Sequence, residues 1–155
     1  MIKNELTETD NKIIALLQRD ARVRMETLAA ETGASVATVQ RRIRELKRKG
    51  VITGDVTVVA PQALGFAMTF LILVELERES ILQLDEFRRK MKAEPQVQQC
   101  YYITGEADFA LIALARDMQD FQELTQRLFF DDPNIKRFRT SVVMDRTKVS
   151  ISVPV

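Results

Sequence analysis

Apolar residues recur at helical spacing in the first 50 residues of the chain. In the stretch "LTETDNKIIALLQRD", one acid and three apolar residues share a helical face: Asp10, Ile13, Ile14 and Leu17. Thr7 followed by Asp10 three residues later is typical of a capping-box start. A second, shorter helix is expected in "METLAAETG", where Gly33 would end the helix because glycine adopts left-handed backbone angles at little cost.

The third helical pattern, over residues 35–49, is the most clearly sorted. Ser35 is a favourable N-cap residue, and Gly50 ends the pattern. One face is apolar, with residues at spacings of three, four and three: Val36, Val39, Ile43 and Leu46. The opposite face is polar and cationic: Thr38, Gln40, Arg41, Arg42, Arg44, Lys47, Arg48 and Lys49. We therefore expect the positive charge on the side of this helix that faces away from the core.

The second and third helices are expected to form a helix-turn-helix, with the small Ala29 where the helices approach and a tight turn at Gly33 and Ala34. The segment "VTVV" (residues 56–59) is predicted to be a short β-wing. A cationic helix face often only contacts water, but the helix-turn-helix framework favours DNA binding. The residues expected near base edges are Ser35, Ala37, Thr38, Gln40 and Arg41, and those expected at phosphates are Arg42, Arg44, Lys47 and Arg48.

The second half of the chain alternates between strand and helix patterns. Strands are predicted at 66–77, 97–104, 109–115 and 137–149, and helices at 81–94 and from 118 to the segment "DDPN". This order is that of the ferredoxin-like βαββαβ fold. The sequence therefore predicts an α+β protein, with an N-terminal winged helix-turn-helix domain and its linker at residues 1–60 and a ferredoxin-like domain at residues 61–155.

The strands predicted at 66–77 and 109–115 are apolar on both faces. In a ferredoxin-like domain both helices cover the same face of the sheet, so the other face would expose a large apolar patch. Soluble monomers rarely tolerate such a patch. A second copy of the same chain is the simplest cover, and we therefore expect a homodimer built on the second domain.

Composition adds a charge asymmetry to this picture. The chain of 155 residues has a formal net charge of +1, but residues 1–50 carry +4 and residues 51–155 carry −3, which fits two domains with different partners. No apolar run approaches the roughly 18 residues of a membrane helix. The N-terminal stretch "MIKNELTETD" has no apolar signal region, and the single Cys100 cannot form an internal disulfide. We therefore expect a cytoplasmic protein without a membrane partner.

The residue types argue against an enzyme. The chain has no histidine, which is the commonest general base and metal ligand, and its one cysteine has no histidine partner. The segment "GEADF" lacks the spacing of a glycine-rich phosphate loop. We therefore expect no catalytic residue, no bound metal and no cofactor.

Several stretches, in content and in order, resemble the leucine-responsive/asparagine-responsive (Lrp/AsnC, feast or famine) transcription regulators: "LTETDNKIIALLQRDAR", "LAAETGASVATVQRRIRELKRKGVITG", "ALGF", "TGEADF" and "RTSVVM". The resemblance covers nearly the whole chain, although Lys47 and Asp55 stand where the pattern often has Glu and Tyr. It implies a winged helix-turn-helix that binds double-stranded DNA, and a ferredoxin-like effector and oligomerisation domain whose dimers assemble into tetramers or octamers. It also implies an amino acid or similar small molecule as effector, bound near the turn between the second and third strands, at a contact between dimers.

The turn "TGEAD" is the expected effector site. Tight turns expose backbone N–H groups that suit a carboxylate, Asp108 could accept from an ammonium group, and threonine and serine residues offer hydroxyl groups. The residues expected at this site are Thr104, Gly105, Glu106, Ala107, Asp108, Thr140 and Ser141. An ordinary solvated hairpin turn is the alternative interpretation of this segment.

Two other functions stay open at this point. An architectural protein that coats DNA without sensing an effector would have the same residues, so it is the main alternative to an effector-responsive regulator. Some relatives with this architecture resemble haem-pathway decarboxylases. Those enzymes are expected to rely on histidines, and the absence of histidine here argues against that class.

Overall fold

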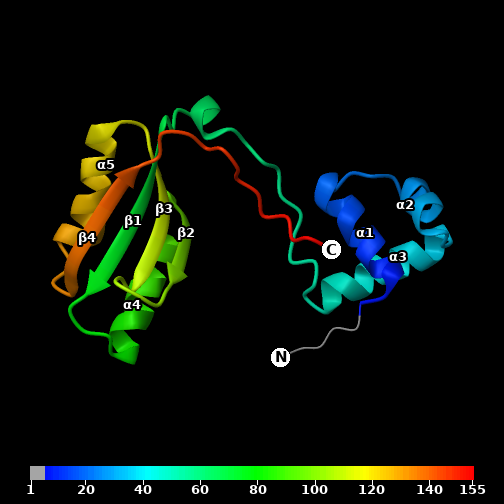
Figure 1. The fold of residues 1–155 in the computed structure, drawn as a ribbon, viewed down its shortest axis with the longest axis horizontal. Coiled ribbons are helices and arrows are strands. Elements are labelled where there is room, and N and C mark those ends of the chain that lie inside the picture. The colour runs from blue at the N-terminus through cyan, green and yellow to red at the C-terminus, as the bar shows by residue number, and fades with distance from the viewer. Residues whose placement is uncertain (1–5) are drawn as a thin grey trace. The chain divides into compact units, whose positions relative to one another are not determined.

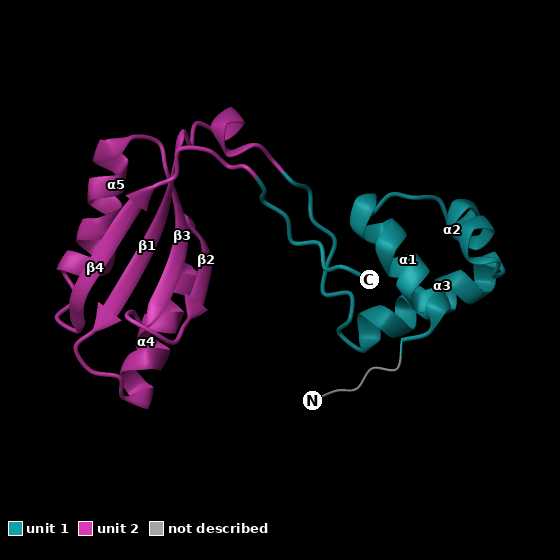
Figure 2. Ribbon diagram, viewed as in Figure 1, with its two compact units in different colours: residues 1–58, 148–155 teal, residues 59–147 magenta. Residues whose placement is uncertain are grey.

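The computed structural model describes residues 6–155, which fall into two compact units (Figure 2). The first unit comprises the chain up to Val58 together with Lys148–Val155, and the second comprises Val59–Thr147. The sequence pattern assigns the C-terminal segment to the second domain, whereas its contacts group it with the first. The Gln18 side chain donates to the carbonyl of Val153 (2.9 Å) and accepts from its N–H (2.7 Å). The expectation about an export signal depends in part on residues 1–5, which lie outside the described residues.

The first unit holds three helices, α1 (Glu8–Arg19), α2 (Met25–Thr32) and α3 (Val36–Arg48) (Figure 1). The capping box of α1 is confirmed, because the Thr7 hydroxyl accepts from the N–H of Asp10 (3.2 Å) and the Asp10 carboxylate accepts from the N–H of Thr7 (2.9 Å). Gly33 ends α2 in the left-handed conformation, with a φ of 70°. Six buried side chains form the core of this unit: Ile13, Ile14, Leu28, Val39, Ile43 and Leu46.

The β-wing predicted at residues 56–59 is wrong for this chain, since residues 53–60 form no strand. Val56 and Val58 are 70% and 88% exposed. A strand is held by hydrogen bonds to a neighbouring strand, and the described backbone hydrogen bonds give residues 55–59 no such neighbour. The segment therefore has strand-forming residues but no partner strand among residues 6–155.

The second unit is a four-stranded sheet with two helices. Its elements are β1 (Met68–Leu76), α4 (Ile81–Ala93), β2 (Val97–Tyr102), β3 (Phe109–Ala115), α5 (Met118–Thr125) and β4 (Ile135–Val142), with a short turn η1 (Pro61–Leu64) before β1 and a π-helical turn η2 (Gln126–Phe130) after α5. The strand order is β2-β3-β1-β4, and every neighbouring pair is antiparallel. The predicted ferredoxin-like βαββαβ arrangement is thus confirmed (Figure 1).

Both helices of the second unit pack on the same face of the sheet. The buried β1 residues Phe70 and Ile72 share one core with Phe87 of α4 and Phe121 of α5. The rings of Phe70 and Phe121 stack with centroids 3.7 Å apart. Because successive strand residues point to opposite faces, the residues between these core positions lie on a face that neither helix covers.

This uncovered face of the sheet is apolar at its centre. Leu71 of β1 pairs with Ile112 of β3, and Leu73 pairs with Ala110. Leu71 is 39% exposed, and the other three are half-buried. The apolar patch expected on this side of the sheet is therefore present in the second unit.

The ends of two elements differ from the prediction. The last strand, predicted at 137–149, runs over Ile135–Val142; its last pair with β1 is Val142 opposite Phe70, and one further hydrogen bond joins the N–H of Val143 to the carbonyl of Thr69 (2.9 Å). The helix that begins at Met118 changes to the π-helical turn η2, where the Lys90 ammonium donates to the carbonyl of Leu128 (2.7 Å). Over residues 6–155, no helix is both long and apolar enough to cross a lipid bilayer.

Candidate functional site

The exposed face of α3 carries most of the residues predicted to contact DNA. Val39, Ile43 and Leu46 are buried, while the predicted contact residues are exposed or, for Thr38 and Arg42, half-buried. The exposed set is Ser35, Ala37, Gln40, Arg41, Arg44, Lys47 and Arg48. The predicted sorting of apolar and cationic side chains is therefore realised in the folded unit.

The start of α3 combines capping groups with candidate base-reading groups. The Ser35 hydroxyl accepts from the N–H of Thr38 (3.2 Å) and lies 2.9 Å from the Thr38 hydroxyl, so both hydroxyls help to hold the helix end. Gln40 and Arg41 are exposed beyond them, and Arg41 pairs with Glu45 (3.2 Å). Glutamine suits adenine and arginine suits guanine in the major groove, so these side chains have the chemistry to read bases.

Arg42 differs from the prediction that it meets a phosphate. Its guanidinium pairs with Asp10 of α1 (3.2 Å) and with Glu45 (3.3 Å), and it donates to the Thr7 hydroxyl (2.9 Å). The Asp10 side chain is only 6% exposed and that of Arg42 only 23%. A carboxylate so far from water needs a cationic partner, and Arg42 supplies it. The sequence contained a signal for this role, because Asp10 lies on the apolar face of its helix.

The three cations nearer the end of α3 remain available to a partner. Arg44 and Arg48 form no ion pair with any described residue. Lys47 pairs with Asp55 of the following segment (2.8 Å), with both side chains about half exposed. An exposed pair of this kind contributes only about 0–1 kcal/mol, so it would not prevent Lys47 from contacting a phosphate.

The turn at residues 104–108 joins β2 to β3. The N–H of Ile103 donates to the carbonyl of Asp108 (2.8 Å) and closes the hairpin. Gly105 has a φ of 120°, which only glycine adopts readily. Thr104, Gly105 and Glu106 are exposed, whereas Ala107 is 5% exposed and packs inward. In the described hydrogen bonds the N–H groups of residues 105–107 have no acceptor.

Asp108 is more engaged with its own chain than the sequence suggested. One of its carboxylate oxygens accepts from the N–H of Leu76 (2.7 Å), and its own N–H donates to the carbonyl of Val74 (2.9 Å). These bonds hold the turn against the end of β1. The other carboxylate oxygen accepts no hydrogen bond among the described residues.

Thr140 and Ser141 do not lie beside this turn in the same chain. The strand order places β1 between β3 and β4. Thr140 pairs with Ile72 and Ser141 with Leu71, in the middle of β1, whereas Asp108 of the turn bonds to Val74 and Leu76 at the end of β1. As neighbours on a strand, the two hydroxyls also point to opposite faces of the sheet. The predicted effector residues are therefore not assembled into one site by a single chain.

One acid that the sequence argument did not single out lies on the uncovered face of the sheet. Glu75 of β1 is 13% exposed and pairs with Arg137 and Arg139 of β4. The hydrogen bond from Arg137 lowers the pKa of the Glu75 carboxyl below its usual range. Arg139 also contacts Glu106 of the turn (3.3 Å), so β4 is linked electrostatically to the β2–β3 turn.

Known families and proteins match the chain over nearly its whole length. Residues 6–53 match a winged helix-turn-helix DNA-binding family, and residues 69–153 match the Lrp/AsnC ligand binding domain. The sequence is 40% identical to an HTH-type transcriptional regulator of Sinorhizobium fredii. The 151 aligned residues cover 97% of this chain and 89% of that protein. It is 28% identical to the leucine-responsive regulatory protein of Rhizobium meliloti, over 100% of this chain and 99% of that one.

Solved structures share this fold. A transcriptional regulator of Neisseria meningitidis in complex with L-methionine superposes with a TM-score of 0.89 at 24% identity, over 96% of both chains. The AsnC protein of Escherichia coli superposes with a TM-score of 0.84 at 24% identity, over 93% of this chain and 95% of that one. At this level of identity the likeness establishes the fold.

Proposed function

Because the chain belongs to the Lrp/AsnC family of transcriptional regulators, we propose that it recognises operator DNA with the exposed face of α3 and responds to an amino acid bound at residues 104–108. The family consists of DNA-binding regulators and not of enzymes. The observation that carries the DNA proposal is the sorting of α3, whose apolar side is buried while its cations are exposed.

The exposed face of α3 divides into two parts with different tasks. Ala37, Gln40 and Arg41 near the helix start approach base edges and specify sequence, whereas Arg44 and the cations after it contact phosphates and position the helix. The helix has 13 residues, which span about 20 Å, and the major groove is about 12 Å wide. Ser35 and Thr38 hold the helix start in place through their capping bonds.

A DNA titration at several salt concentrations tests this division. Arg44→Gln should weaken binding to all sequences, and the slope of log K against log salt should become shallower by about 0.9, the contribution of one phosphate contact. Lys12→Gln is the charge-matched control, because Lys12 lies on α1 and pairs with Glu8; its slope should equal that of the wild type. Wild-type binding that does not depend on salt would contradict the proposal.

The uncovered face of the sheet supports a homodimer. Its centre is apolar at Leu71, Leu73 and Ile112, and the charges beside it are matched within the chain by the pairs that Glu75 forms. A second copy packed on this face would bury the apolar centre. The α3 helix of that copy would then contact a second DNA half-site, whose centre lies about 34 Å from the centre of the first. Such dimers are the units from which tetramers or octamers would form.

Analytical ultracentrifugation tests the dimer. The wild type should sediment as a dimer or a multiple of it, and Leu71→Lys should shift it toward the monomer without unfolding it. Leu82→Lys is the control, because Leu82 is 81% exposed on α4, away from the uncovered face. A wild type that stays monomeric at micromolar concentration would rule out this assembly.

The turn at residues 104–108 supports the effector proposal. Its free N–H groups suit the carboxylate of an amino acid, and the second oxygen of Asp108 can accept from the ammonium group. Since the strand order separates Thr140 and Ser141 from this turn by β1, a neighbouring copy supplies those hydroxyl groups in the proposed site. The Neisseria regulator that shares the fold was solved with L-methionine, which supports an amino acid as the ligand class.

A thermal-shift screen of the twenty amino acids identifies the effector, because a ligand at 100 times its Kd stabilises the native state by about 2.7 kcal/mol. The decisive pair of variants is Asp108→Asn and Glu106→Gln. Asparagine keeps an oxygen for the N–H of Leu76 but loses the charge that attracts an ammonium group. Asp108→Asn should therefore lose the response, and Glu106→Gln should keep it. Equal responses would place the ligand elsewhere.

An effector-independent architectural role is the second candidate, and one observation favours it. Asp108 already uses its carboxylate to hold the end of β1, which gives this residue a structural reason to be present without any ligand. If no amino acid shifts the melting temperature or the DNA affinity of the wild type at millimolar concentration, this second function becomes the better description.

A further inference from the structure

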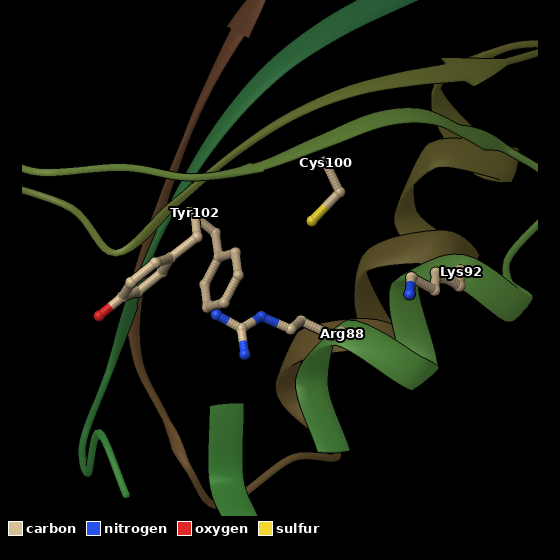
Figure 3. Close-up of a pocket in the computed structure, with 5 residues that line it drawn as sticks. Arg88, Lys92, Cys100 and Tyr102 are labelled. Carbon is tan, nitrogen blue, oxygen red and sulfur yellow. The ribbon is translucent and has the colours of Figure 1, made fainter. Parts of the chain in front are cut away.

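A small groove lies between α4 and the edge strand β2, on the side of the sheet that the helices cover (Figure 3). Its volume is about 240 Å³, and it is lined by Arg88, Lys92, Cys100, Tyr102 and Phe109. In the sheet register Cys100 lies opposite Leu111 and Tyr102 opposite Phe109. Both partners are buried against the helices, so the two β2 side chains lie on the side that α4 covers.

The two α4 side chains bring positive charge to this groove. Arg88 and Lys92 are four residues apart and therefore lie on one side of the helix, and both line the groove. Figure 3 shows the Arg88 guanidinium turned toward Tyr102 of β2. The Arg88 guanidinium lies 5.3 Å from the centre of the Tyr102 ring, and one of its nitrogens pairs with the exposed Asp85 (2.9 Å). Lys92 forms no ion pair within residues 6–155.

The remaining groups that line the groove are uncharged near neutral pH. Burial raises the pKa of the Cys100 thiol, so the sulfur stays protonated. The Tyr102 hydroxyl donates to Glu79 (3.0 Å), and this bond raises the pKa of the phenol. Phe109 is 1% exposed and contributes an apolar wall. The groove therefore combines two cations with an aromatic surface and has no carboxylate among its lining residues.

We propose that this groove binds a small carboxylate that carries an apolar group and lacks an ammonium group, such as a 2-oxo acid. The carboxylate lies between Arg88 and Lys92, and the apolar group packs on Phe109 and Tyr102. The volume of about 240 Å³ is below the roughly 300–1,000 Å³ of pockets for drug-sized ligands, so it suits a molecule of amino-acid size.

The absence of a lining carboxylate sets the specificity of this site. A zwitterionic amino acid would bring its ammonium group close to two cations, and like charges at short distance repel. The two carboxylates nearest the lining residues, Asp85 and Glu79, are already paired with Arg88 and the Tyr102 hydroxyl. The turn at residues 104–108 offers the opposite chemistry, because Asp108 can accept from an ammonium group. The groove is thus a site separate from the proposed effector site, and its ligand class does not depend on that proposal.

Cys100 makes occupancy of the groove directly measurable, because it is the only cysteine in the chain and it lines the groove. The experiment follows alkylation of the full-length protein by neutral iodoacetamide, with 4-methyl-2-oxopentanoate as the probe. At ten times its Kd the probe should slow alkylation about tenfold, because only the unoccupied fraction reacts. Leucine has the same side chain with an ammonium group, and inorganic phosphate is an anion without an apolar part; both should protect far less.

Two variants on α4 locate the effect, each measured as the ratio of rates with and without the probe. Lys92→Gln should abolish most of the protection, and Arg89→Gln, an equal change of charge at an exposed position outside the groove, should keep it. The proposal is overturned if the oxo acid gives no protection at millimolar concentration, if leucine or phosphate protects equally well, or if Lys92→Gln is protected as well as the wild type.

Discussion

Arg42→Gln is the substitution that most sharply separates a structural cation from a DNA-binding one. In the folded unit the Arg42 guanidinium contacts Asp10 at 3.2 Å and Glu45 at 3.3 Å. It also donates to the hydroxyl of Thr7, which caps α1. The substitution removes the cation that bridges α3 to α1 and leaves the Asp10 carboxylate, 6% exposed, with only its capping bonds.

The cost follows from the burial of the pair. Removing one partner of a buried ion pair costs about 3–5 kcal/mol, and because Arg42 is partly reached by water we expect about 2–3 kcal/mol. For a unit of this size that is a fall of about 10–20 °C in melting temperature. Circular dichroism during heating measures it. Arg41→Gln is the control, because Arg41 forms an exposed pair with Glu45, and its loss should cost about 0–1 kcal/mol.

DNA titration completes this test. At a temperature where both variants are folded, Arg42→Gln should bind DNA with the salt slope of the wild type, whereas Arg44→Gln should not. If Arg42→Gln instead melts like the wild type and flattens the salt slope, then Arg42 is a phosphate contact, as the sequence pattern predicts, and the bridging role is wrong.

Four further outcomes are expected. Asp108→Ala should lower the free energy of unfolding in urea by about 1–3 kcal/mol, because a backbone N–H of β1 loses its acceptor. Gly105→Val should lower the melting temperature, since its φ of 120° strains a β-branched residue by about 1–3 kcal/mol. Arg137 lowers the pKa of Glu75, so this pair should stabilise the fold fully above the ordinary carboxyl pKa and lose that effect as pH falls through the lowered value. Urea titrations at several pH values measure this, and the free energy of unfolding should depend less on pH in Glu75→Gln than in the wild type. Arg41→Ala should reduce the preference for operator over mutated operator in competition titrations by about 1–3 kcal/mol if it reads a guanine.

Local patterns were sufficient to predict the elements of both units. Burial on one side of an element leaves a periodic trace in the sequence, so the strand at 109–115 was predicted with the bounds of β3. The capping box of α1 was also predictable from the sequence, because its two residues are three positions apart in the chain. Elements that are held by neighbours within the sequence, or by one buried face, were therefore accessible without a structure.

Contacts between distant residues explain what the sequence did not reveal. The pattern placed Arg42 among the outward cations, but the nearby Asp10 of another helix turns it inward. It predicted a strand at 56–59, and that prediction is wrong because strand formation needs a second strand. It grouped Thr140 and Ser141 with the turn at 104–108, whereas the sheet order separates them by β1. In each case the outcome depends on a partner whose position the local sequence does not specify.

The two proposed ligand sites differ in the number of chains that are needed to form them. The effector site at 104–108 lacks Thr140 and Ser141 within one chain, so on our proposal the ligand binds only where two copies meet. Binding of the amino acid must then favour that assembly. A coupling free energy of about 1–3 kcal/mol between ligand and DNA would change the affinity for DNA about 5- to 150-fold, and DNA would change the affinity for the ligand by the same factor.

The groove beside α4 is lined by a single chain. Dilution that dissociates the assembly should therefore weaken binding of the amino acid and leave protection of Cys100 by the oxo acid unchanged. If dilution weakens both equally, the groove too needs a second copy.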